Sequence, residues 1–164
     1  MKPRIFQEQQ RFTQWWLWLI IAMVILIPLY KPFMTLLNGG ALVGSPLDVG
    51  FWIGFVVAIG VVLLFRFLKL ETAIDEHGIS LQFHPFQKQP RRISWSELQS
   101  VRTRKYNPIL EYGGWGFKSG ISGGAYNVKG NRGIQLQLKS GKKLLIGTQK
   151  PKEAQEIIDK YFKS

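Results

Sequence analysis

Two long uncharged runs near the start of the chain constrain its fold more than any other feature. Residues 15–30 carry no charge, residues 12–14 lengthen that run to nineteen, and residues 49–65 form a second run of seventeen. About 20 mainly apolar residues cross a hydrocarbon core about 30 Å thick, because each helical residue adds about 1.5 Å. Arg66 can extend its stem toward the headgroups and lengthen the second run. The sequence predicts membrane-spanning helices over about 12–30 and 49–68.

Two other interpretations of these runs fit less well. Two buried helices of a soluble protein would need apolar cover on every side, which the remaining polar-rich chain is too short to supply. A cleaved signal peptide has an apolar run of about 7 to 15 residues and a small-residue cleavage site, and neither matches the first run. Within the second run, Gly50 and Gly54 have the small-xxx-small spacing that lets a neighbouring helix approach closely.

The flanking charges predict the orientation of the spans. Lys2, Arg4 and Arg11 precede the first run, and Arg66 and Lys69 close the second. The connection between the runs carries one basic and one acidic residue. By the positive-inside rule, both termini face the cytoplasm and the connection is a short external turn.

Beyond the second span, the apolar pattern changes to the alternation of β-strands. Residues 70–83 predict a first hairpin with a turn at 75–78, and a strand begins at Ile93 and Trp95. Residues 134–146 predict a second hairpin that turns at Ser140 and Gly141. We therefore divide the chain into a helical hairpin, 1–69, and a cytoplasmic domain, 70–164.

The last segment changes to helical spacing. Ala154, Ile157, Ile158 and Tyr161 follow the i, i+3, i+4, i+7 pattern, and Pro151 suits the first helical position. Strands followed by one helix predict an α+β domain in which a curved antiparallel sheet or barrel is capped by the C-terminal helix.

Three short segments give a family resemblance: 93–98 (ISWSEL), 111–116 (EYGGWG) and 147–151 (GTQKP). With the two spans, they resemble small uncharacterised bacterial membrane proteins that carry a pleckstrin-homology-like (PH-like) domain. The resemblance implies a PH-like fold and a place in the bacterial cell (inner) membrane. It implies no activity.

The stretch from Tyr106 to Gly133 holds eight of the seventeen glycines. Successive backbone N–H groups in such a loop can bind phosphate, but the glycine spacing fits neither a dinucleotide-binding motif nor a P-loop. The alternative is structural, with tight turns and an edge strand on which aromatic residues pack. Within this stretch, Glu111 is the one carboxyl group that burial among aromatic residues would give a raised pKa. It carries the enzyme interpretation, a small membrane enzyme or enzyme subunit using residues 111–124.

Charge indicates a different kind of site. From residue 69 onward, seventeen Lys or Arg stand against eight Asp or Glu, a net charge of +9. Cations beside anionic lipid contribute about 1 kcal/mol each. The same cations have a simpler explanation in solubility and topology. No recognised nucleic-acid motif accompanies them. The candidate binding residues are the densest cations and two aromatics of the glycine-rich stretch: Arg91, Arg92, Arg102, Arg104, Lys105, Tyr112 and Trp115.

No cofactor or metal is predicted. The chain has no cysteine, and its two histidines, His77 and His84, are spaced unlike a ligand pair on a helix. The leading hypothesis is a non-enzymatic membrane module. Its basic domain binds anionic headgroups or a membrane-protein partner, the latter at the Trp115 loop, and a homo-oligomer stays compatible with the sequence.

Overall fold

The computed structural model describes residues 5–40, 49–120 and 123–162. Contacts divide the chain into two compact units. The helical unit is Thr13–Phe67, and the strand-rich unit combines Met1–Phe12 with Leu68–Ser164. The chain therefore leaves the strand-rich unit once, forms the helices, and returns to it.

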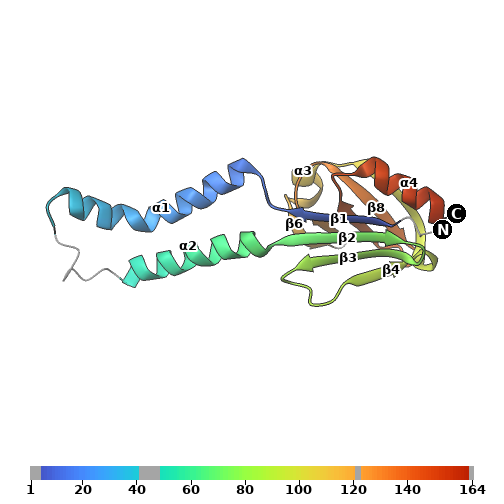
Figure 1. Ribbon diagram of the computed structural model, residues 1–164, viewed down its shortest axis with the longest axis horizontal. Coiled ribbons are helices and arrows are strands. Elements are labelled where there is room, and N and C mark those ends of the chain that lie inside the picture. Colours follow the sequence, from blue (N-terminus) through green and yellow to red (C-terminus); the bar gives the residue numbers. More distant parts are fainter. Residues whose placement is uncertain (1–4, 41–48, 121–122, 163–164) are drawn as a thin grey trace. The chain divides into compact units, whose positions relative to one another are not determined.

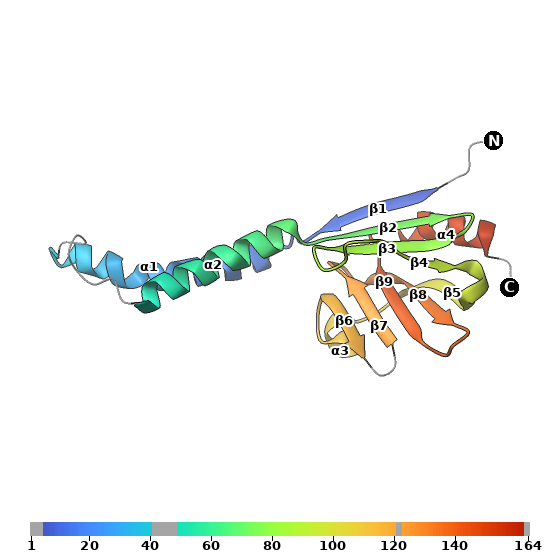
Figure 2. The ribbon, with the colours of Figure 1, turned by 90° about the horizontal axis from the view of Figure 1, so that it is seen from below.

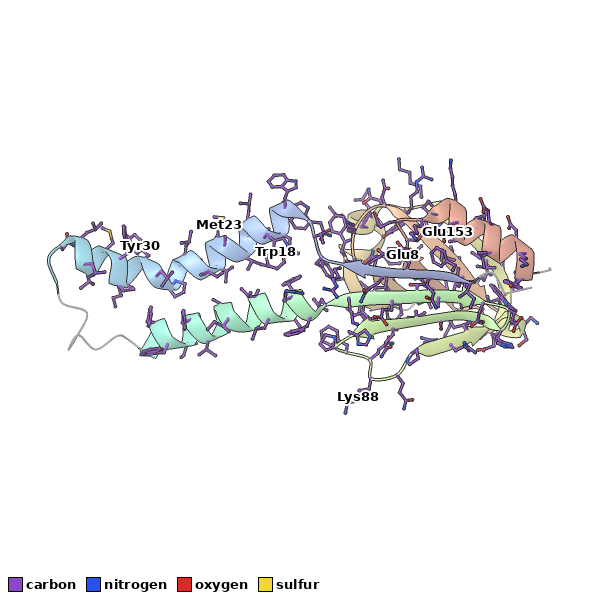
Figure 3. All side chains as sticks on the ribbon, viewed as in Figure 1. Glu8, Trp18, Met23, Tyr30, Lys88 and Glu153 are labelled. Carbon is purple, nitrogen blue, oxygen red and sulfur yellow. The ribbon has the colours of Figure 1, made fainter. Side chains whose placement is uncertain are left out.

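The helical unit consists of two antiparallel helices, α1 (Trp15–Leu37) and α2 (Val49–Phe67) (Figure 1). Both are long and apolar enough to cross a membrane. Helix α1 continues seven residues beyond the predicted end at Tyr30, through Pro32, while α2 matches the predicted second span closely. Side chains along α1, among them Met23 and Tyr30, are exposed (Figure 3).

Close packing between the two helices occurs at one of the two predicted small residues. A Cβ atom added to Gly54 would lie 3.3 Å from the Cβ of Pro28, whereas one added to Gly50 would have no atom of the described residues within 4 Å. The close approach that we expected from this glycine pair is therefore made by Gly54. The pyrrolidine ring of Pro28 occupies the space next to Gly54, where any other residue would have a side chain.

The segment before α1 is strand β1 (Phe6–Arg11), although it lies within residues 1–69, the predicted helical hairpin. It pairs antiparallel with β2 (Lys69–Asp75), with Arg11 opposite Lys69 and Phe6 opposite Ile74. Phe6 is fully buried. The side chains of Phe6, Glu8 and Gln10 share the more buried face of β1, and two of these three residues are polar. Its core face therefore carries no hydrophobic pattern that would predict a strand.

Two sheets make up the strand-rich unit (Figures 1 and 2). The first has the order β1-β2-β3-β4, with β3 at Gly78–His84 and β4 at Arg91–Ser94. The second has the order β5-β8-β9-β7-β6. Its strands are β5 (Leu98–Lys105), β6 (Gly116–Gly120), β7 (Gly123–Asn127), β8 (Arg132–Leu138) and β9 (Lys143–Gly147). All neighbours are antiparallel except β7 and β9.

Both predicted hairpins are confirmed, as β2–β3 and β8–β9. The strand predicted at Ile93 ends at Ser94, because Trp95–Glu97 form a 3₁₀ turn into β5. In that turn the Ser94 and Glu97 side chains satisfy each other's backbone N–H groups as a capping box. The predicted α+β order is confirmed, but the strands do not close into a barrel, since they form two separate sheets.

Helix α4 (Pro151–Tyr161) contacts strands of both sheets, namely β1, β2, β5 and β8. Its apolar stripe is buried at Ala154, Ile157 and Ile158, as the helical spacing predicts. The connection before it is bonded to β1, because the Thr148 hydroxyl and the Gln149 backbone N–H both donate to the Glu8 carboxylate, at 2.6 and 2.8 Å. Strand β1 is thus bonded to the segment that immediately precedes the last helix.

Candidate functional site

A polar cleft of about 800 Å³ lies on the face of the second sheet that points away from the main core. Register defines this face, because Arg102 is opposite Gln135 and Lys143 is opposite Gln137, and directly opposed residues share a face. We call it the main cleft. Its lining residues are Ser100, Arg102, Arg104, Glu111, Tyr112, Gly123, Gly124, Gln135, Gln137 and Lys143.

A short helix, α3 (Pro108–Tyr112), supplies one wall of the main cleft. The Asn107 side chain caps its start by accepting from the backbone N–H groups of Ile109 and Leu110, both at 3.1 Å. Gly113 ends it with a φ of 68°, a left-handed conformation that glycine adopts without strain. The Tyr112 ring packs against Tyr106, Ala125 and Leu145 and so fixes α3 to the sheet.

Arg104 organises the polar groups at the α3 end of the cleft. Its two terminal nitrogens donate to both oxygens of Glu111, at 3.2 and 2.6 Å, and its Nε donates to Gln135 at 3.0 Å. It also donates to the Tyr112 hydroxyl at 3.4 Å. Such a two-pronged guanidinium–carboxylate pair fixes both side chains in place. Arg104 therefore acts as a structural part of the cleft wall.

Glu111 does not have the raised pKa that the enzyme interpretation requires. Hydrogen bonding from Arg104 lowers the pKa of Glu111, and the backbone N–H of Asn107 also donates to it, at 2.8 Å. Its side chain is 37% exposed. The expectation of a buried carboxyl with a raised pKa, on which the alternative enzyme interpretation depended, is wrong, because the neighbouring cation stabilises the carboxylate and α3 leaves it open to water.

Arg102 and Lys143 are the cations of the main cleft with no protein counter-charge. In the described part of the chain, neither side chain makes a hydrogen bond or an ion pair. Both are exposed, and they come from strands β5 and β9, which β8 separates. The described residues of the cleft wall include three cations and one carboxylate, and Arg104 already pairs with that carboxylate. The main cleft thus holds uncompensated positive charge.

A second hollow of about 220 Å³ shares Gly123, Gly124 and Lys143 with the main cleft. We call it the side hollow. Arg91 of β4 enters it from the first sheet, together with Lys118 and Lys142. Among the described residues that line it, none is acidic. The side hollow therefore adjoins the main cleft at Gly123, Gly124 and Lys143, and its other lining residues add Arg91, Lys118 and Lys142 to the cations of this region.

Gly123 is required where the two hollows meet. Its φ is 134°, and a Cβ atom there would overlap the backbone of Lys143. The absence of a side chain therefore allows β7 to lie against β9 in parallel, which brings Lys143 directly beside Gly123. Here the glycine-rich stretch has the structural role, with α3 and the β6–β7 hairpin formed from it.

The other predicted binding residues lie elsewhere. Arg92 is paired with Asp75 at 2.8 Å on the first sheet. Lys105 lies at the end of β5, in another hollow of about 510 Å³ that is lined with Tyr106 and Asn107 and that shares one described residue, Glu111, with the main cleft. The Trp115 indole donates to the Gly130 carbonyl at 3.0 Å. Of the seven predicted residues, the main cleft collects Arg102, Arg104 and Tyr112, and the side hollow adds Arg91.

Sequence reasoning missed Lys118, Lys142 and Lys143. A signal was present for Lys143, because the β8–β9 hairpin was predicted and its register brings Lys143 opposite Gln137. What the sequence lacks is the place of β5 beside β8, since more than 25 residues separate these strands along the chain. Arg102 and Lys143 therefore meet only in the folded domain.

Among residues 5–40, 49–120 and 123–162, no group of three or more His, Cys, Asp or Glu side chains is arranged to hold a metal ion. Burial raises the pKa of the Tyr106 hydroxyl and that of the Tyr112 hydroxyl. The cleft therefore offers hydroxyl, amide and cationic groups, which are suited to binding an anion.

No family model, no curated protein and no solved structure matches this chain.

Proposed function

We propose that this chain is a non-enzymatic membrane module whose strand-rich unit binds anionic lipid headgroups in the main cleft and the side hollow. The observation that carries the proposal is the uncompensated positive charge of Arg102 and Lys143 in a cleft bordered by hydrogen-bonding side chains. A phosphate group accepts hydrogen bonds both from cationic side chains and from neutral hydroxyl and amide groups. The membrane surface supplies such phosphates next to any domain attached to two spans.

We further propose that the strand-rich unit is a PH-like domain on the cytoplasmic side of a bacterial inner membrane. Antiparallel strands followed by a packed C-terminal helix support the PH-like assignment, although the parallel β7–β9 pair departs from an all-antiparallel sheet. The pairing of Arg11 with Lys69 supports placing the start of α1 and the end of α2 on the same side of the membrane. Arg11 precedes α1, Lys69 follows α2, and the two residues are neighbours in one sheet. The basic flanks favour the cytoplasmic side.

The test uses the full chain in a neutral detergent, titrated with short-chain phosphatidylglycerol or phosphatidylcholine and followed by native mass spectrometry. We expect preferential retention of the anionic lipid, weakening as salt rises, because exposed charges are screened over about 8 Å at physiological ionic strength. Arg102→Gln with Lys143→Gln should weaken binding by about 2 kcal/mol, roughly 30-fold, at about 1 kcal/mol for each cation.

The matched control is Lys139→Gln with Lys152→Gln. It removes the same net charge from exposed positions outside both hollows. We expect it to keep the anionic preference, and surface substitutions of this kind change stability by no more than about 0.5 kcal/mol. If both double variants lose the same amount of anionic-lipid binding, the effect comes from net charge and not from the two hollows. Absence of lipid preference, with an acidic membrane protein captured through Arg102 and Lys143, would replace the lipid by a protein partner.

Topology is tested separately. A reporter active only outside the cytoplasm, fused after Ser164, should stay silent. A second reporter fused before residue 5 should give the same answer, because β1 and β2 are paired. Activity of either reporter would overturn the orientation.

A further inference from the structure

Exposed apolar side chains of the strand-rich unit are concentrated at one end of it. In the described part of this unit, five large apolar residues are strongly exposed, and four of them gather there: Phe86 (62%), Ile109 (62%), Leu110 (83%) and Phe117 (48%). The fifth, Ile5, lies at the opposite end of β1. Single exposed apolar residues are ordinary, but a group of them on one end of a domain indicates an interaction surface.

Strand register shows that this end is the one from which the chain leaves for the helices. His84 is opposite Lys69, so the β3–β4 connection with Phe86 lies where β2 begins. That connection also carries Lys88 (Figure 3). On the second sheet, Gln10 donates to the Gly147 carbonyl at 2.6 Å, and Gly147 is opposite Gly133.

The same register places α3 at this end. Gly133 is opposite Arg104, near the end of β5. Helix α3 begins at Pro108, three residues after β5 ends at Lys105. Figures 1 and 2 show α3 and β6 at the end of the strand-rich unit where β1 ends and β2 begins. Ile109 and Leu110 are in the first turns of α3, and Asn107 caps the backbone N–H groups of both. We call the surface formed by Phe86, Ile109, Leu110 and Phe117 the apolar end.

A row of aromatic rings connects two members of the apolar end. Phe86 stacks on Phe83 at 6.0 Å, Phe83 is 6.3 Å from Tyr126, and Tyr126 is 4.8 Å from Phe117. Phe83 and Tyr126 are buried, so Phe86 and Phe117 are the two exposed ends of a packed row. Both rings are therefore fixed at the surface by the core behind them.

Chain length determines what can cover this end. Three residues separate Arg11 from α1, and Leu68 alone separates α2 from β2. At no more than about 3.6 Å per residue, these connections reach about 14 Å and 7 Å. With the helices in a bilayer, the ends of β1 and β2 then lie at the headgroup layer, and the apolar end lies on that side of the unit. Lys105 and Arg132 are exposed cations that lie opposite each other at the ends of β5 and β8. Their charge complements the anionic charge of the headgroup layer.

We propose that the apolar end inserts into the interfacial layer of the bilayer, with Leu110 of α3 as its most deeply buried residue and Phe86 as a second contact. This inference rests on the proposed function only in taking α1 and α2 as membrane spans. It adds an apolar membrane contact to the binding of anions. Burial of apolar side chains at the headgroup–acyl boundary, with cations beside them, is how proteins dock on a membrane surface.

The test exploits the absence of cysteine. Single cysteines replace Leu110, Phe86 or Ile5 in the full chain, each is labelled with the environment-sensitive fluorophore NBD, and the proteins are reconstituted in phosphatidylcholine–phosphatidylglycerol nanodiscs. Ile5→Cys is the matched control, because Ile5 is an exposed aliphatic residue of the same unit at the other end of β1. We expect blue-shifted emission from Leu110→Cys and Phe86→Cys, quenched by lipids carrying a nitroxide near the headgroup. Ile5→Cys should emit as in water and resist the quencher.

Water-like emission at both test positions, with the anionic preference intact, would overturn the inference and leave the proposed function standing. Blue-shifted emission that lipid nitroxides do not quench would mean that protein covers the apolar end, which also overturns it. Quenching at Leu110→Cys without any anionic preference would support the inference while the proposed headgroup binding fails. A second variant, Ile109→Ser with Leu110→Ser, should lose the quenching at Phe86→Cys if the surface docks as one unit.

Discussion

The side-chain amide of Gln10 donates a hydrogen bond of 2.6 Å to the Gly147 carbonyl, joining residues that are 137 positions apart. Gln10 is 3% exposed. The bond connects the strand before the first helix to the end of the second sheet. It makes the start of the chain part of the strand-rich unit.

Phe6→Ala should destabilise the strand-rich unit by about 3–5 kcal/mol, the usual cost of emptying a buried phenylalanine site. Phe6 is fully buried, whereas its neighbour Ile5 is 49% exposed. The matched control, Ile5→Ala, should cost no more than about 0.5 kcal/mol. Urea unfolding of the full chain in detergent, followed by the β-sheet circular dichroism signal, measures both. Equal stability of the two variants would contradict the place of β1 in the core.

Ile158→Asp should unfold the strand-rich unit, because it buries an unpaired carboxylate where α4 meets the sheets. Ile158 is 1% exposed. Lys152→Asp adds the same carboxylate to an exposed position of the same helix and should leave the unit folded. Backbone hydrogen exchange across β5 and β8 reports the difference. Protection that survives in Ile158→Asp would show that α4 does not dock.

Gly54→Val should weaken the association of α1 with α2, because its branched side chain meets Pro28 where a single Cβ atom would already lie 3.3 Å away. Gly60→Val is the control, since a Cβ atom added there meets none of the described atoms within 4 Å. Small residues allow membrane helices to pack closely. Pair distances between spin labels on the two helices, in bilayers, should broaden in Gly54→Val only. An unchanged distribution would place the helix contact elsewhere.

Removing the charge of Glu111 should make the strand-rich unit less sensitive to acid. Hydrogen bonding from Arg104 holds the pKa of Glu111 below its ordinary value, so folding favours the carboxylate. Its contribution is therefore complete above the unfolded pKa, about 4.3, and disappears as the pH falls through the lower pKa of the folded state. Both side chains are partly exposed, at 27% for Arg104 and 37% for Glu111, which keeps the effect under about 1 kcal/mol.

Unfolding free energies of the full chain between pH 7 and pH 3 provide the measurement for Glu111. Wild type should lose more stability below about pH 4.3 than Glu111→Gln, because the variant has no carboxylate to protonate. Glu156→Gln, on the exposed side of α4, is the comparison for loss of a carboxylate alone. Parallel pH profiles for wild type and Glu111→Gln would mean that the Arg104 pair contributes nothing to stability.

Local patterns predicted the parts of the fold whose signals lie within a few residues. Uninterrupted apolar runs predicted α1 and α2, alternation predicted the β2–β3 and β8–β9 hairpins, and the spacing of Ala154, Ile157 and Ile158 predicted the buried face of α4. In each case a repeating period determines which side chains are buried together.

Tertiary structure alone decided the rest. Strand β1 has too few apolar residues to show a period, and pairing with β2 after 55 residues of the helical unit makes it a strand. The cleft required β5, β8 and β9 to become neighbours, which unites Arg102 with Lys143. Hydrogen bonding from Arg104, which reaches Glu111 only through the fold of α3 against β5, lowers the pKa of the Glu111 carboxyl. Contacts between distant segments depend on how the strands are ordered in space, and no local repeat in a sequence encodes that order.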